Sequence, residues 1–188
     1  MRIPPMDPRV EKPFRKALGH ALRNEHEQMR EGLLRLTDEQ IEACLGLCAY
    51  VSGYIAIYVC GMQWPDEDNL RGIGEATTTS NNARAFGLKA EDSYAYVKRV
   101  ALRKEPLNTV FSPPDYAATL SFVITGHILV SFCKPEEEWW EHLTRVEEAW
   151  EFAQVVDLDL LPVLMLRSRQ PAAPSGPPSS PGANTVTS

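Results

Sequence analysis

The residue best suited to acid–base chemistry is His127, which stands in an apolar stretch, "VITGHILV". An imidazole changes its charge near neutral pH, so a buried one can act as a general acid, a general base or a ligand. Ser131 follows one helical turn later, and Tyr54 could bring a hydroxyl from another element. We therefore consider a pocket built from His127, Ser131 and Tyr54. The simpler interpretation, which we favour, is a hydrogen-bonded histidine of the core.

The cysteines are the other residues with the chemistry of a site. Cys44 and Cys48 are four apart and share a helical face, and Cys60 or Cys133 could complete a zinc site. Structural zinc sites more often use cysteines separated by two residues, outside apolar helices. No Glu-x-x-His pair, Gly-rich phosphate loop or nucleophile elbow occurs in the chain. The sequence therefore predicts no metal, no cofactor and no recognisable catalytic residue.

A helix predicted over residues 135–154 carries the strongest charge, with seven glutamates and a single arginine. Its apolar stripe recurs at 4-3-4-3 spacing and consists of Trp139, Leu143, Val146, Trp150 and Ala153. Two aromatic residues, Trp140 and Phe152, lie beside the stripe. Exposed aromatic rings rimmed by carboxylates are typical of a protein interface. We therefore expect a basic partner to dock on Glu137, Trp140, Glu141 and Phe152. The alternative is a wide buried stripe with a solvated acidic face.

Charge and composition limit the classes of partner. The net charge of the 188-residue chain is −6, whereas general nucleic-acid affinity needs a basic surface. A helix-turn-helix pattern over residues 83–100 is weak, because its second helix opens with Glu91 and Asp92, which phosphates repel. We therefore expect no nucleic-acid partner. The first residues lack the apolar segment of a signal peptide, and four cysteines without a paired framework are typical of reduced thiols, so we expect a cytoplasmic protein.

Helices must position these residues, because the apolar periodicity is helical and no alternating run is long enough for a sheet. Thr37–Gln40 has the pattern of a capping box, and Ser112 that of an N-cap before Pro113. We predict one all-α domain over residues 1–169, a bundle of about six helices, and a disordered Pro- and Ser-rich tail over 170–188. The expected helices span 7–36, 38–62, 69–88 (closing at Gly87), 90–104, 113–133 and 135–154, with a short docking helix near 155–166.

The uncharged run from Ala43 to Gln63 has the length of a membrane span, and with residues 116–133 it could form a two-span hairpin. Its three tyrosines, however, follow i, i+4, i+8 spacing through the middle, whereas membrane helices place them at their ends. A seam of small residues would let the second apolar stretch approach closely. The seam consists of Gly46, Ala49, Gly53, Ala56 and Cys60, and its expected contacts are Ala118, Ser121 and Thr125. We therefore favour a buried central helix of the bundle, with the membrane hairpin as the alternative.

These patterns together favour a non-catalytic interaction protein, such as a regulator or adaptor. It would bind a protein partner or a second copy of itself through the acidic, Trp-rich helix. The first alternative is a small-molecule-binding protein or an enzyme with a pocket at His127. The second alternative is a two-span membrane protein.

Overall fold

The computed structural model describes residues 8–134 and 136–155, and these ranges contain helices and no strand. The predicted all-α class is confirmed. The tail predicted over 170–188 and nearly all of the docking helix expected near 155–166 lie outside the described residues. The helical elements are α1 (Pro8–Leu22), α2 (His26–Leu33), α3 (Asp38–Val59), α4 (Glu67–Thr77), α5 (Asn81–Phe86), α6 (Ala90–Ala95), the π-helical segment η1 (Tyr96–Leu102), α7 (Leu107–Val110), α8 (Pro114–Ser131) and α9 (Trp139–Val155).

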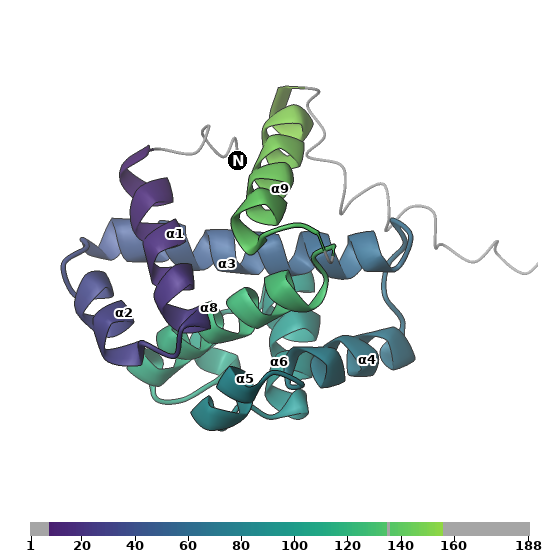
Figure 1. Cartoon of the computed structure of the whole chain (residues 1–188), viewed down its shortest axis with the longest axis horizontal. Helices are drawn as coiled ribbons and strands as arrows, with labels where there is room; N and C mark the ends of the chain where they lie inside the picture. Colours follow the sequence, from purple (N-terminus) through teal and green to yellow (C-terminus); the bar gives the residue numbers. More distant parts are fainter. Residues whose placement is uncertain (1–7, 135, 156–188) are drawn as a thin grey trace, which may run out of the picture.

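The helix at the centre of the bundle is α8, rather than the predicted 38–62 helix. Every residue over 121–129 is buried, and α8 packs against α1, α2, α3, α4, α7 and α9. Figure 1 shows it running between α3 and the group formed by α4, α5 and α6. In contrast, α3 is buried mainly on one side: Cys48 and Ile55 are inaccessible, whereas Tyr58 is 44% exposed. Two helices of similar apolar composition therefore differ in how completely they are covered.

The start of α3 follows the predicted capping box. The Thr37 hydroxyl accepts from the Gln40 N–H at 3.3 Å, and the Thr37 N–H donates to the Gln40 side chain at 3.0 Å. By length and composition α3 is also the one described helix that could cross a membrane. In the structure it packs against α1, α8, α9 and η1, and 44% of its apolar window is buried.

The single helix predicted over 7–36 is divided in two near Asn24. Asn24 adopts the left-handed conformation, with φ at 61°, which asparagine tolerates better than most residues. The Glu25 N–H then donates to the His20 carbonyl at 2.9 Å, which closes α1. The Glu25 side chain bonds to Nδ1 of His20 at 2.7 Å and accepts from the Arg23 side chain at 3.0 Å. Side-chain contacts therefore stabilise a turn in a stretch without glycine or proline.

The helix predicted over 69–88 is also divided, at the run of threonines. The Thr77, Thr78 and Thr79 hydroxyls each donate to the carbonyl three residues earlier, at 2.8–2.9 Å. These bonds add to the backbone hydrogen bonds at the end of α4, where the Glu75 and Ala76 carbonyls also accept from the Thr78 and Thr79 N–H groups. Ser80 then caps α5, and Gly87 ends it in the left-handed conformation, with φ at 76°, as expected from the sequence.

The boundaries of the last helices differ slightly from those expected. Pro113 is the N-cap of α8 and Pro114 its first residue, so the prediction that Ser112 caps this helix is wrong by one position. The acidic helix α9 begins at Trp139, after a turn, rather than at Pro135. The helix predicted over 90–104 is present as α6 followed directly by η1.

The small-residue seam of α3 meets η1 at Gly53. A Cβ added at Gly53 would lie 3.2 Å from the carbonyl oxygen of Ala101, a backbone atom of η1. The contact with α8 is made instead by Ser52, whose hydroxyl lies 3.0 Å from that of Thr125. The expectation that Gly53 packs against the 113–133 helix is therefore wrong. Gly53 does allow a neighbouring helical segment to approach closely, as expected, but that segment is η1.

We predict that Gly53→Leu destabilises the protein by about 1–3 kcal/mol or more, because overpacking would push η1 away from α3. Gly46→Leu is the matched control: Gly46 belongs to the same seam, but an added Cβ there meets nothing within 4 Å. Urea unfolding of both variants followed by circular dichroism measures the difference. Equal unfolding midpoints would show that η1 does not depend on a close approach at Gly53.

Candidate functional site

His127 joins α8 to α5. It is 3% exposed, and its Nδ1 lies 3.2 Å from the Ser80 hydroxyl oxygen. That oxygen accepts from the Ala83 N–H at 3.0 Å, so the hydroxyl proton can be donated to Nδ1. Burial, together with the nearby His26, lowers the pKa of His127 to about 4. The ring is therefore neutral at pH 7, which agrees with a hydrogen-bonded histidine of the core.

A second imidazole, that of His26 at the start of α2, lies close to this one. The His26 ring packs against Phe86 with centroids 4.4 Å apart, and its Nε2 lies 2.5 Å from the Asn24 side-chain oxygen. Its Nδ1 is buried without a hydrogen-bond partner among the described residues, and burial lowers the pKa of His26. Phe86 in turn stacks on Tyr116 of α8. Two neutral imidazoles thus lie within an aromatic junction of α2, α5 and α8.

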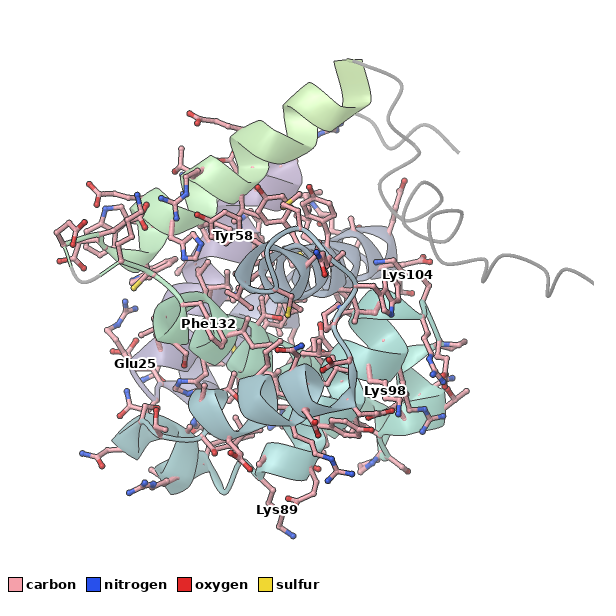
Figure 2. All side chains as sticks on the ribbon, turned by 90° about the vertical axis from the view of Figure 1, so that its right-hand side faces the viewer. Glu25, Tyr58, Lys89, Lys98, Lys104 and Phe132 are labelled. Carbon is pink, nitrogen blue, oxygen red and sulfur yellow. The ribbon has the colours of Figure 1, made fainter. Side chains whose placement is uncertain are left out.

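The three residues predicted for a pocket do not form one site. Ser131 lies one turn beyond His127 on α8, is exposed, and donates to the carbonyl of Ala76 at 3.2 Å. Tyr54 lies on α3 between Tyr50 and Tyr58, with ring centroids 6.1 and 6.2 Å apart. His127 and Ser131 therefore face the end of α4 and the start of α5, whereas Tyr54 belongs to a ladder of tyrosines that ends at exposed Tyr58 (Figure 2).

A buried cluster of hydroxyls, which the sequence did not indicate, lies at the centre of the bundle. The Thr125 hydroxyl donates to the Cys48 carbonyl at 3.3 Å and also pairs with Ser52. Tyr96, the first residue of η1, is fully buried beside them. Burial raises the pKa of its phenol, while the hydroxyls of Thr125, Ser121 and Ser52 act in the opposite direction. The cluster therefore holds protonated, neutral groups, which suit structural hydrogen bonding rather than catalysis.

The cysteines are placed as packing residues. Cys44 and Cys48 are inaccessible, and burial raises the pKa of the Cys44 thiol to about 11 and that of Cys48 well above its usual range. A thiol must lose its proton to bind zinc or attack a substrate. Among the described residues, no three Cys, His, Asp or Glu side chains are grouped as metal ligands.

One face of α9 anchors it to the bundle. Nδ1 of His142 lies 3.2 Å from the Leu129 carbonyl of α8, which it can bind only as a donor. Trp139 lies against α1, where a Cβ added at Gly19 would be 3.6 Å from its ring. Glu147 is buried and forms an ion pair with Arg15 of α1. Figure 1 shows the last turns of α9 extending beyond the other helices.

The outward face of α9 carries two of the four predicted docking residues, Trp140 and Glu141, both of which are exposed to solvent. Trp140 is 47% exposed, and Glu141 is exposed beside it, with its carboxylate accepting from the Glu138 N–H at 3.0 Å. Glu137, in contrast, is paired with Arg145 at 2.8 Å and its side chain is only 13% exposed. The side chain of Phe152 lies outside the described residues. The structure therefore places Trp140 and Glu141 at the surface and turns Glu137 inward.

Two of the surface hollows in the described part of the chain are lined by basic residues. The larger, about 320 Å³, lies beside Trp64, Lys98 and Arg103, but Lys98 is already paired with Glu67 and Tyr94. The smaller, about 240 Å³, lies between α1 and α2 and is bordered by lysine and arginine side chains over an apolar floor. Neither hollow contains a residue of the predicted pocket.

The α5–α6 pair has the outline of a helix-turn-helix, since Gly87 separates two short helices. Its second helix opens with Glu91 and Asp92, as the sequence indicated, and continues without a break into η1. No family model, no curated protein and no solved structure matches the chain.

We predict that the protein loses stability as the pH falls from about 6.5 towards 4. The folded state holds His127 neutral, with a pKa of about 4, whereas the unfolded chain takes up the proton near pH 6.5. Protonation therefore favours unfolding by roughly 3 kcal/mol once the pH is below both values. Urea unfolding at several pH values should show a shallower loss for His127→Gln than for the wild type. Parallel pH profiles for the two proteins would contradict this role of His127.

Proposed function

We propose that this is a non-catalytic cytoplasmic interaction protein that binds a basic partner through the outward face of α9. The proposed contact, here called the Trp140 surface, consists of Trp140, Glu141 and Glu148. The observation that carries the proposal is the 47% exposure of Trp140 on a helix whose other face is anchored to the bundle. Glu141 and Glu148 are exposed on the same outward side.

The energetics of interfaces support this choice. Tryptophan is among the residues that contribute most binding energy when a partner buries them, and surrounding charges contribute to partner selection. The Trp140 ring already packs edge-on against Trp139, with centroids 5.7 Å apart. A partner that covers it therefore loses little side-chain conformational entropy on binding. Glu141 and Glu148 form no ion pair with another described residue, so their carboxylates would attract a basic surface. A partner with lysines or arginines around an apolar recess therefore fits best.

Two further observations favour binding over the alternatives. His127, Ser131 and Tyr54 each have separate contacts, so the residues predicted for a catalytic or ligand pocket are dispersed. The second stretch of the two-span alternative is α8, whose residues 121–129 are covered by helices of the same chain. A lipid-facing span would need that surface to be open.

The test begins with the full chain carrying a photo-crosslinking residue in place of Glu148. The control carries it in place of Lys89, which projects from the opposite end of the molecule from α9 (Figure 2). Analytical ultracentrifugation of the unmodified protein first shows whether a second copy is the partner. We expect a basic protein to be captured from the position of Glu148 and not from that of Lys89.

The captured partner, once purified, is titrated against the wild type and three variants. Trp140→Ala should weaken binding by about 2 kcal/mol or more, without lowering the melting temperature, because the ring is half exposed. Glu141→Gln should slow association and reduce its salt dependence while keeping the bond to the Glu138 N–H. Glu75→Gln, an exposed carboxylate on α4, is the matched control. Unchanged affinity for Trp140→Ala would contradict the proposal.

A further inference from the structure

The hollow between α1 and α2 has the character of a peptide-binding groove. We call it the basic groove and define it by the cations Lys12, Lys16 and Arg35 at its rim and the apolar Ala17, Leu33 and Leu36 at its floor. Its volume is about 240 Å³. Leu34, directly beside it in the chain, is 71% exposed. The groove lies on the side of α1 defined by Lys12 and Lys16, next to the side that binds α9 through Arg15.

The cations of the basic groove have no internal counterpart. Lys12, Lys16 and Arg35 are exposed and form no ion pair with another described residue. Arg15, one turn along the adjacent side of α1, is in contrast paired with Glu11 and Glu147. Three like charges around an apolar floor, in a chain with a net charge of −6, call for an occupant that is both acidic and apolar.

We propose that residues 157–166 of this chain bind in the basic groove. Their sequence, "DLDLLPVLML", combines two carboxylates with leucine, valine and methionine side chains and contains no basic residue. Asp157 and Asp159 are the only acidic side chains after Glu151. The carboxylates pair with the lysines at the rim, and the following leucines cover the floor. The groove is distinct from the Trp140 surface, so this inference does not depend on the proposed function.

The position of the end of α9 makes the groove accessible to this segment. Trp139 lies against Gly19 of α1 and Glu147 pairs with Arg15, so α9 runs antiparallel to α1. The C-terminal end of α9, at Val155, therefore points to the same side of the bundle as the N-terminal end of α1, as Figure 1 shows. An extended chain spans about 3.3–3.6 Å per residue, and a helix is about 10–12 Å wide. The four residues from Val155 to Asp159 can thus span about 13–14 Å, which exceeds the width of one helix.

Zero-length crosslinking of the full, unmodified chain tests the proposal. A carbodiimide joins a lysine amine to a carboxylate as an amide only where the two groups are in contact. Peptide mass spectrometry should find Lys12 or Lys16 joined to Asp157 or Asp159. The ion pair between Lys98 and Glu67 is the internal positive control, and exposed Lys89 is the negative one. A mixture of light and isotope-labelled protein separates crosslinks within a chain from those between chains.

Gly32→Leu blocks the groove without disturbing the fold. Gly32 lines the groove within α2, and a Cβ added there meets nothing within 4 Å. The variant should lose the crosslinks to Asp157 and Asp159 and keep the one between Lys98 and Glu67. Reversing the charges at both sides, with Lys12→Glu, Lys16→Glu, Asp157→Lys and Asp159→Lys together, should restore a crosslink that either pair of changes alone abolishes.

The outcomes separate cleanly. Crosslinks within one chain that disappear in Gly32→Leu support the proposal. Crosslinked peptides that join light to labelled chains in the proportion expected for random pairing would overturn it in favour of docking on a second copy. Absence of the crosslink beside a normal yield for Lys98 and Glu67 would overturn it altogether, as would its persistence in Gly32→Leu.

Discussion

The structure depends on the enclosure of α8, a helix that is apolar around its whole circumference. Because such a helix has no side that tolerates water, neighbouring helices must cover every face of it. The buried polar side chains of α8 determine how the neighbouring helices are positioned on it. Ser121 donates within α8, whereas Thr125 binds α3 and His127 binds α5. A buried polar group without a partner is costly, so these two links fix the register of α3 and α5 as well as their presence.

Enclosure of α8 also explains the placement of α9. Once α1 and α3 cover α8, α9 can reach it only along one narrow strip, through the His142 imidazole on the Leu129 carbonyl. Trp139 and Glu147 contact α1 on the same side of α9. Because only one face of the helix is anchored, Trp140, which lies outside that face, remains partly in solvent. The packing of the opposite face of α9 against the bundle holds the helix in place, so the Trp140 side chain is preorganised for a contact.

Two local signals in the sequence predicted helix ends correctly, whereas the choice among apolar faces was not reliable. The capping box at Thr37 and the left-handed Gly87 follow from neighbouring residues, and both were predicted correctly. The turn at Asn24 has no glycine or proline and depends on contacts made by Glu25, so periodicity continued through it. The sequence also could not show whether α3 or α8 is the more buried helix. Both are apolar in composition, and composition does not show how many neighbouring helices will cover each of them. For the same reason it placed Gly53 against α8 rather than η1, and Glu137 outside rather than on Arg145.

The electrostatics of α1 connect the two surfaces that are proposed to bind. At i, i+4 spacing, Glu11 and Arg15 form one side of the helix and Lys12 and Lys16 the next. The first side is neutralised inside the protein, since Arg15 binds Glu11, Thr144 and Glu147. Arg15 of α1 thereby compensates the charge of Glu147 on α9. The carboxylates of α9 that stay exposed are those on the side that faces away from α1. The second side keeps its positive charge because Lys12 and Lys16 form no ion pair with another described residue. The charge of Arg15 on the first side of α1 is thus compensated within the protein, whereas the charges of Lys12 and Lys16 on the second side are not. A further acidic segment can therefore bind α1 at these two lysines.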